Sequence, residues 1–153
     1  KYVPPRQELK TGWKLFLQRE DSDEQVLPAF RTFTPRFAFN VWYHDDKDGT
    51  IYSDSGSKEK EDFAPFKDDP DNKDHYSYGY HLFSDLKQAL LVLNACPNRI
   101  GLNYHYVLVE VEYDQVVAEG TQSFWYHAPG SIEQQIIETN CVVARSIRLK
   151  QCA

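Results

Sequence analysis

The chain is poor in the features that mark disulfide-stapled, zinc-bound and membrane-spanning proteins. Its 153 residues include three cysteines, Cys96, Cys141 and Cys152, and no C-x-x-C pair. An odd number of cysteines at these spacings fits neither a disulfide framework nor a structural zinc site, so we expect a reducing, cytoplasmic location. No apolar run approaches the roughly 18 residues of a membrane-spanning helix, and we therefore expect no membrane partner.

The common catalytic fingerprints are absent as well. The sequence has no G-x-G-x-x-G, no P-loop, no G-x-S-x-G, no H-E-x-x-H and no pair of H-x-S or H-x-T motifs. These absences argue against the reaction classes that depend on those motifs, and the sequence favours a protein that is not an enzyme.

Positive charge is also in short supply. The net charge is −6 and the isoelectric point is about 5.3. A protein that binds nucleic acid through the phosphate backbone needs a basic face, so we expect no direct nucleic-acid binding. The densest basic run, Arg145, Arg148 and Lys150, is interpreted as the solvated face of a strand.

The negative charge is concentrated in one segment. Residues 45–74 hold eleven Asp and Glu against five Lys, and the difference of six equals the net charge of the whole chain. Unstructured connections of this length are uncommon in compact domains. We therefore expect a flexible arm over 1–10 and a single domain over 11–153, with 45–77 as an acidic loop or insertion.

Aromatic residues are abundant and favour a folded domain. The chain has ten Tyr, nine Phe and three Trp, and apolar residues make up 41% of it. Alternating patterns predict an α+β domain with a largely antiparallel sheet and one or two helices packed on it. The expected strands are 13–18, an edge segment 26–33, 37–43, 78–83, 104–113 with a hairpin turn at Asp114-Gln115, 116–117 continued by 124–126, and 141–149.

One helix is predicted with more support than any other element. Ser84 is placed to be its N-cap, Asp85 lies in its first turn, and Pro97 ends it. The expected buried face has the spacing i, i+3, i+4 and i+7: Leu86, Ala89, Leu90 and Leu93. The segment 131–139 is compatible with a second short helix or with a loop followed by a strand.

Three groups of residues are candidate sites from their chemistry alone. Asp46-Lys47-Asp48-Gly49 resembles the middle of a calcium-binding loop, although the plain interpretation is an Asp-Gly turn. Glu110 and Glu112 share one strand face, either as a carboxylate pair or as the wet side of a sheet. Four histidines each follow a tyrosine: His44, His81, His105 and His127. If every tyrosine points inward, the histidines would share an outer face and could form a metal or phosphate site. We favour the simpler explanation, a surplus of strand-forming aromatic residues.

The second half of the chain resembles a family of small phage and bacterial proteins that has no assigned activity. The resemblance covers residues 78–150 and rests on Gly79-Tyr80-His81-Leu82-Phe83, on Val109-Glu110-Val111 and on the closing segment Val143–Leu149. It implies a phage or bacterial accessory protein, in the host cytoplasm if the protein is of phage origin.

The same order of segments is similar to the core of the ADP-ribosyltransferase fold. That likeness implies nicotinamide stacking on Tyr78 or Tyr80 beside His81, and a late acid at Glu133 or Glu138. Its first strand should offer an Arg or His to the NAD pyrophosphate, whereas here it offers Trp13 and Lys14 with Arg19 beyond. The likeness therefore implies a degenerate active site that binds NAD or another nucleotide.

Three hypotheses follow, in order of preference. The first is a non-catalytic binding protein that acts on a host or cellular protein through an acidic and aromatic surface. The second is the nucleotide-binding domain, and the third is a virion or structural component that self-associates through strand edges. The sequence does not specify an oligomeric state.

Overall fold

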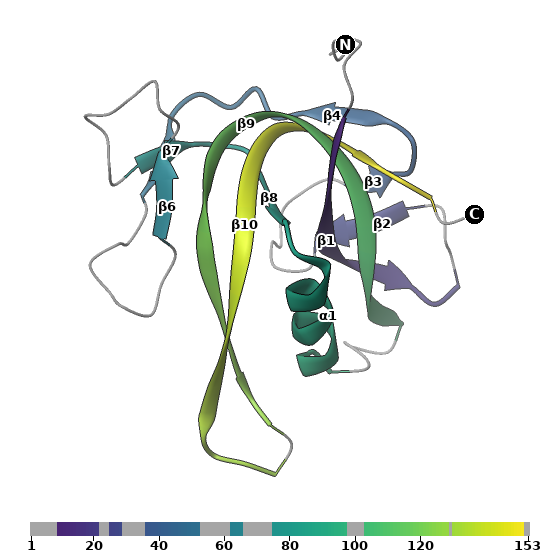
Figure 1. The fold of residues 1–153 in the computed structure, drawn as a ribbon. Helices are drawn as coiled ribbons and strands as arrows, with labels where there is room; N and C mark the ends of the chain where they lie inside the picture. The colour runs from purple at the N-terminus through teal and green to yellow at the C-terminus, as the bar shows by residue number, and fades with distance from the viewer. Residues whose placement is uncertain are drawn as a thin grey trace.

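Two long strands that pair side by side and arch over the rest of the molecule organise the fold (Figure 1). The computed structural model describes residues 9–21, 25–28, 36–52, 62–65, 75–97, 103–128 and 130–151. The elements are β1 (Lys10–Arg19), β2 (Gln25–Pro28), β3 (Phe37–Ala38), β4 (Trp42–His44), β5 (Thr50–Tyr52), β6 (Asp62–Pro65), β7 (His75–Ser77), β8 (Tyr80–Phe83), α1 (Leu86–Ala95), β9 (Tyr104–His127) and β10 (Gln134–Leu149).

Four of the strands pair with one another in a closed ring. β1 pairs with β9 along its whole length, from Lys10 opposite Tyr113 to Arg19 opposite Tyr104. On its other side β1 meets β8 where Trp13 lies opposite Phe83. β8 pairs with β10, and β10 pairs with β9, so the order β1–β8–β10–β9 returns to β1. All of these pairings are antiparallel, as the sequence predicted.

A glycine permits the closure between β1 and β8. A Cβ atom added to Gly12 would lie 3.0 Å from the carbonyl oxygen of Phe83, with the Tyr113 ring at 3.4 Å. Strand glycines commonly mark places where another backbone approaches closely.

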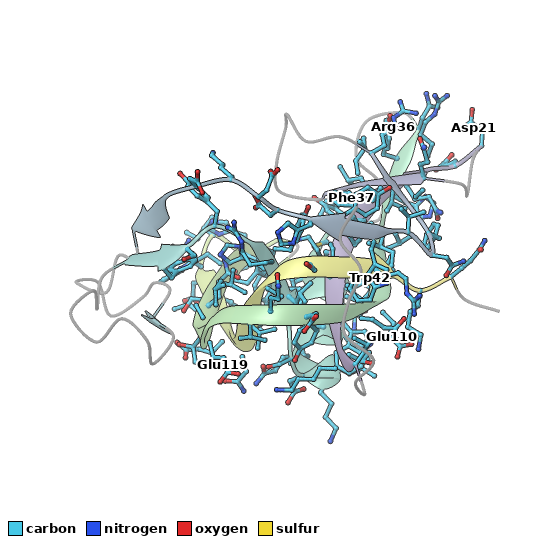
Figure 2. The ribbon with its side chains drawn as sticks, turned by 90° about the horizontal axis from the view of Figure 1, so that it is seen from above. Asp21, Arg36, Phe37, Trp42, Glu110 and Glu119 are labelled. Carbon is cyan, nitrogen blue, oxygen red and sulfur yellow. The ribbon has the colours of Figure 1, made fainter. Side chains whose placement is uncertain are left out.

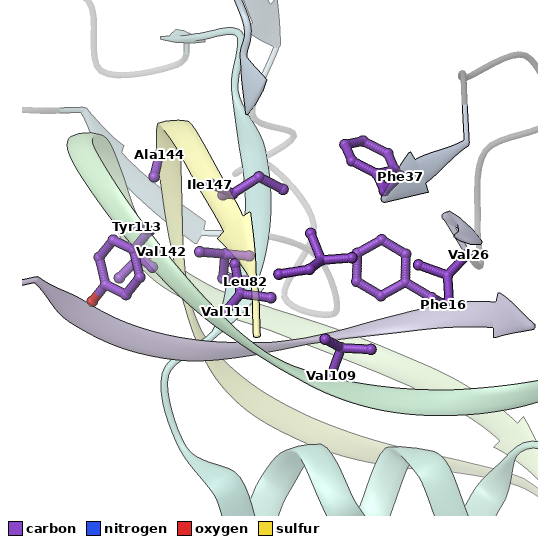
Figure 3. Close-up of a cluster of buried hydrophobic side chains, with 11 residues drawn as sticks. Phe16, Val26, Phe37, Leu82, Val109, Val111, Tyr113, Val142, Ala144 and Ile147 are labelled. Carbon is purple, nitrogen blue, oxygen red and sulfur yellow. The ribbon is translucent and has the colours of Figure 1, made fainter. Parts of the chain in front are cut away.

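The main hydrophobic core fills the inside of this ring (Figure 3). Val109 and Val111 point inward from β9, which confirms the alternation seen in the sequence, and Phe16 enters from β1. Phe37 closes one end of the core with its ring edge against Phe16 at a centroid distance of 5.7 Å. The other buried members are Val26, Leu82, Tyr113, Val142, Ala144, Ile147 and Leu149.

The outer surface carries the charged side chains of the long strands. Viewed from above, Glu110 and Glu119 lie along the outer margin, away from Phe37 (Figure 2). A smaller buried cluster also lies off the main core and is covered by Tyr76 of β7: Tyr76, Ala118, Cys141 and Val143. The acidic segment therefore supplies at least one buried aromatic side chain, while most of it lies outside the described residues.

The predicted helix is present, but its cap and its buried face differ from the prediction. Asp85 is the N-cap, and its carboxylate accepts from the Gln88 N–H, in place of Ser84. The fully buried helical residues are Ala89 and Val92, whereas Leu86 and Leu90 are exposed. With this buried face α1 packs against β1, β8, β9 and β10.

The predicted fold class is wrong. In the part of the chain that the structure describes, α1 is the one α-helix, so the protein is nearly all-β and not an α+β domain with packed helices. Of the two alternatives for 131–139, the loop followed by a strand is the one observed, because a strand begins at Gln134 and continues to Leu149.

The hairpin predicted at Asp114-Gln115 is also wrong, because β9 continues through it. Gln115 has a left-handed φ of 60°, and the register with β10 shifts by one residue between Val143 and Ala144. β9 has one extra residue here, Val117, which makes a β-bulge two residues after Gln115, and a bulge bends a strand without reversing it. The bend is the top of the arch.

The single strand predicted over 37–43 is wrong, because a second residue with a left-handed backbone interrupts it. Asn40 has a φ of 64°, which breaks this segment into β3 and β4. β4 then pairs with the end of β10, and the Tyr43 hydroxyl accepts from the Ala38 N–H at 2.8 Å. The edge segment predicted over 26–33 is seen as β2; its remainder lies outside the described residues. No helix in the described residues has the length and apolar character needed to cross a membrane.

Candidate functional site

The ends of β9 and β10 leave the sheet as a two-stranded ribbon. We define the ribbon as residues 122–128 and 130–140; Figure 1 shows it extending past α1, away from the other strands. β8 pairs with β10 from Cys141 onward, and β6 pairs with β9 up to Thr121. Before Cys141, the strand neighbour that the structure describes for β10 is β9 alone.

One face of the ribbon is aromatic. Phe124 and Tyr126 are two residues apart and therefore share a face, and their rings stack at a centroid distance of 6.3 Å. The Tyr126 hydroxyl donates to Oε1 of Gln135 at 2.6 Å across the strand pair. Ile137 lies opposite Phe124 on the same face.

The other face and the tip each carry an exposed isoleucine. Trp125 lies opposite Ile136, whose surface is 44% exposed. Ile132, near the turn, is 97% exposed. A single exposed isoleucine is ordinary, but exposed apolar residues grouped with three aromatics on one projecting element form a candidate interaction surface.

The charge of the ribbon has one sign. From Ala118 to Ala144 the sequence has Glu119, Glu133 and Glu138 and no Lys or Arg. Glu133 and Glu138 are exposed. The ribbon therefore offers an apolar and aromatic surface within a negative field.

The residues predicted from the nucleotide-binding likeness fall into separate places. Trp13, Lys14 and His81 lie together where β1 meets β8, and Lys14 Nζ donates to the His81 carbonyl oxygen at 2.9 Å. The His81 ring lies 2.8 Å from the Tyr76 hydroxyl at its Nε2. Tyr80 is half-buried and packs against the main core.

Burial dominates the electrostatics of Tyr80. Loss of solvent, and then the charge of nearby Asp45, raises the pKa of Tyr80 to about 12, with Arg145 opposing the shift. A tyrosine held neutral inside a packed core stabilises the fold and is poorly placed to stack on a ligand.

Tyr78 lies where hydrogen bonds connect β10 to the acidic segment. The Arg145 guanidinium donates to the carbonyl oxygens of Tyr78 at 2.7 Å and Lys47 at 3.1 Å. The Lys47 ammonium lies 4.2 Å from the centre of the Tyr78 ring, and Gly49 adopts a φ of 108° against the same ring. This contact fixes where the chain leaves the sheet after β4.

The structure does not bring the two late-acid candidates to Tyr80 and His81. His81 lies opposite Val143 of β10, and Glu138 lies five residues earlier along that strand. At about 3.3 Å per residue this is a separation of roughly 17 Å along the strand. Glu133 lies further out still, beside the turn of the ribbon.

The metal-binding candidates are likewise dispersed. Asp46 and Asp48 lie exposed beside the Gly49 turn, and no three His, Cys, Asp or Glu side chains among the described residues gather closely enough to hold a metal ion. His44 Nδ1 lies 2.7 Å from the Ser146 hydroxyl, far along β10 from the ribbon where His127 lies.

The carboxylate pair on β9 is divided between two cations. Glu112 accepts from Nε of Arg148 at 3.0 Å and is well shielded, while Glu110 lies 3.4 Å from Lys150 and is about half exposed. The strand face is therefore an ion-paired surface, and the two carboxylates have separate partners.

No protein family, curated protein or solved structure matches this chain. The likeness to small phage and bacterial proteins therefore stays a prediction. The ribbon was not predicted, although two signals pointed to it: the stretch of 45 residues, 100–144, that has no Lys or Arg, and the apolar residues flanking Gly130 on both sides.

Proposed function

We propose that the protein is a non-catalytic binding module and that the β9–β10 ribbon is the element that contacts its protein partner. The observation that carries this proposal is the exposure of Ile132 and Ile136 on a projecting two-stranded element that also bears Phe124, Trp125 and Tyr126. Aromatic residues are enriched at the centres of protein interfaces because they bury much area with few rotatable bonds.

Charge narrows the class of partner. The ribbon has exposed Glu133 and Glu138 with no Lys or Arg, and the whole chain is acidic at −6. Complementary potentials speed association and disfavour the wrong partners. The proposed partner is a protein whose contact surface is basic and apolar, and the same charge disfavours nucleic acid.

The test is a selection of displayed random twelve-residue peptides on the immobilised full chain. Peptides enriched on the wild-type protein should lose at least tenfold in affinity for the double variant Ile132→Ser/Ile136→Ser. The matched control is Val41→Ser/Leu86→Ser, which removes two exposed apolar side chains, 47% and 42% exposed, that are not part of the ribbon as defined. It should bind the same peptides as the wild type.

Two results would overturn the proposal. Selected peptides that bind both double variants equally well would place the binding surface elsewhere. A wild-type chain that light scattering shows to be a dimer, and that Ile132→Ser/Ile136→Ser converts to a monomer, would show that the ribbon contacts a second copy and not another protein.

A further inference from the structure

The ribbon has an open edge beside α1, and the path of the chain explains why. β8 runs antiparallel to β10 up to the Ser84 N–H, which donates to the Asn140 carbonyl oxygen at 2.9 Å. The chain then turns away into α1 at its N-cap, Asp85. Among the described residues, no strand occupies the place beside residues 134–138 of β10 that a longer β8 would take.

A side chain ends the ladder at this point. Oε1 of Gln88 accepts from the Asn140 N–H at 2.6 Å, in the position where the next backbone carbonyl of β8 would have been. Both backbone groups of Asn140 are therefore satisfied on the β8 side. The next backbone groups of β10 that face this side are those of Glu138, and among the described residues no strand pairs with them.

The alternation of strand hydrogen bonds identifies the open groups. In an antiparallel strand, successive residues direct their N–H and C=O to opposite neighbours. Because Asn140 directs its groups toward the β8 side, Glu138, Ile136 and Gln134 do the same. Among the described residues no strand pairs with β10 on that side before Cys141.

We propose that the partner binds as an extended strand that pairs with the β10 edge at residues 134–138, in line with β8. This inference rests on the proposed function and specifies its binding mode. Main-chain hydrogen bonds to an open sheet edge give such complexes their affinity, and the flanking side chains give them their specificity.

The surroundings of the edge describe the segment it accepts. Ile136 supplies an exposed apolar contact, and Leu91, 55% exposed, lies one helical turn from Gln88 on the side of α1 that meets β10. Glu133 and Glu138 add negative charge at the two ends of the edge. Ile136 and Glu138 are two residues apart and share a face of the strand. The occupant is therefore an extended, proline-free segment that carries both apolar residues and Lys or Arg.

Charge also argues against a second copy as the occupant. Two ribbons paired edge to edge would bring together two surfaces that each carry Glu133 and Glu138 without Lys or Arg. Like charges on adjacent strands destabilise pairing.

The experiment uses the full chain and two synthetic seven-residue probes, one of alternating Lys and Val and one of alternating Glu and Val. We expect the Lys/Val peptide to bind, and to slow amide hydrogen exchange at Gln134, Ile136 and Glu138, while exchange at Gln135 and Ile137 is unchanged. The Glu/Val peptide should bind at least tenfold more weakly.

Two variants separate the backbone from the side chain. Ile136→Pro removes an N–H that points away from β9, so the β9 ladder stays intact, and proline is tolerated at sheet edges for that reason. It should weaken the Lys/Val peptide at least tenfold, whereas Ile136→Thr, which keeps the N–H, should weaken it less than threefold. Unchanged near-ultraviolet circular dichroism and retained slow exchange at Ile137 verify that both variants are folded.

The possible failures are distinguishable. If peptides bind the ribbon but Ile136→Pro and Ile136→Thr behave alike, the strand-pairing mode is wrong and the proposed function survives. If neither the Lys/Val probe nor any selected peptide depends on the ribbon, both are wrong. A wild-type dimer that Ile136→Pro dissociates would show edge pairing between copies and would overturn the proposed occupant.

Discussion

Gly79 and Ala144 approach so closely that no side chain fits between them. A Cβ atom on Gly79 would lie 2.8 Å from the Ala144 carbonyl oxygen and 2.8 Å from a methyl group of Val143. This contact lies at the bend of β10, where its neighbour changes from β8 to β4. The sharp path of the long strands depends on the absence of a side chain here.

The first prediction is that Gly79→Ala lowers the free energy of unfolding by about 2–3 kcal/mol, because the backbone of β10 must move away. The matched control is Gly130→Asn, where the φ of 78° suits asparagine and no atom lies within 4 Å. It should cost less than about 0.5 kcal/mol. Urea unfolding measures both, and equal costs would contradict the role assigned to Gly79.

The second prediction concerns the two carboxylates of β9. Glu112→Gln should cost about 1–2 kcal/mol, since Glu112 is shielded and accepts two hydrogen bonds from Arg148. Glu110→Gln, which loosens the exposed contact with Lys150, should cost less than about 0.5 kcal/mol. The comparison is made by thermal unfolding at low salt, and a larger loss at Glu110 would refute it.

The third prediction is an alkaline loss of stability that depends on Tyr80. Its folded pKa is about 12 against an ordinary value of 10.0, so the unfolded chain releases this proton first as the pH rises. The stabilisation is thus complete below about pH 10 and is lost between about pH 10 and pH 12. Because Tyr80 is partly solvated, we expect the free energy of unfolding to have fallen by about 1 kcal/mol at pH 11 from this titration.

Tyr80→Phe removes this titration. Relative to the wild type, the variant should gain about 1 kcal/mol between pH 8 and pH 11, whatever the packing cost of the substitution at pH 8. The measurement is urea unfolding of both proteins at the two pH values. Parallel pH profiles would contradict the shifted pKa.

The fourth prediction tests which residue caps α1. Asp85→Ala should destabilise the protein by about 1 kcal/mol, because the Gln88 N–H loses its acceptor. Ser84→Ala should have almost no effect, since its backbone N–H, which pairs with Asn140, is retained. Denaturant midpoints of the two variants decide the matter, and the reverse order would reinstate Ser84 as the cap.

Parts of the fold could be predicted because local patterns dominate them. The alternation of Val109 and Val111 with Glu110 specified an amphipathic strand, and the apolar spacing before Pro97 specified a helix. The buried face of that helix was predicted poorly. Leucine and valine are both apolar, so composition does not distinguish the buried side of the helix from the exposed side. In the structure the sheet beneath α1 buries Val92 and leaves Leu90 exposed.

The candidate site was harder to predict because its residues form a surface only through their positions in the folded chain. Ile132, Ile136 and Trp125 look like ordinary strand residues in the sequence. They become a candidate surface only because α1 turns away at Asp85 and leaves the ribbon beyond the edge of the sheet. The sequence also allowed Tyr80 and Glu138 to meet, but the register places Tyr80 of β8 opposite Ala144, and Glu138 lies six residues before Ala144 along β10.

By itself, the sequence determined an acidic, aromatic-rich chain with antiparallel strands and a helix before Pro97, because charge, composition and hydrophobic period are local properties. The tertiary structure decided that the chain bends at Gln115 and continues, that four strands close into a ring, and that one edge stays open. Those outcomes depend on which backbone groups find distant partners, and no local pattern specifies such pairings.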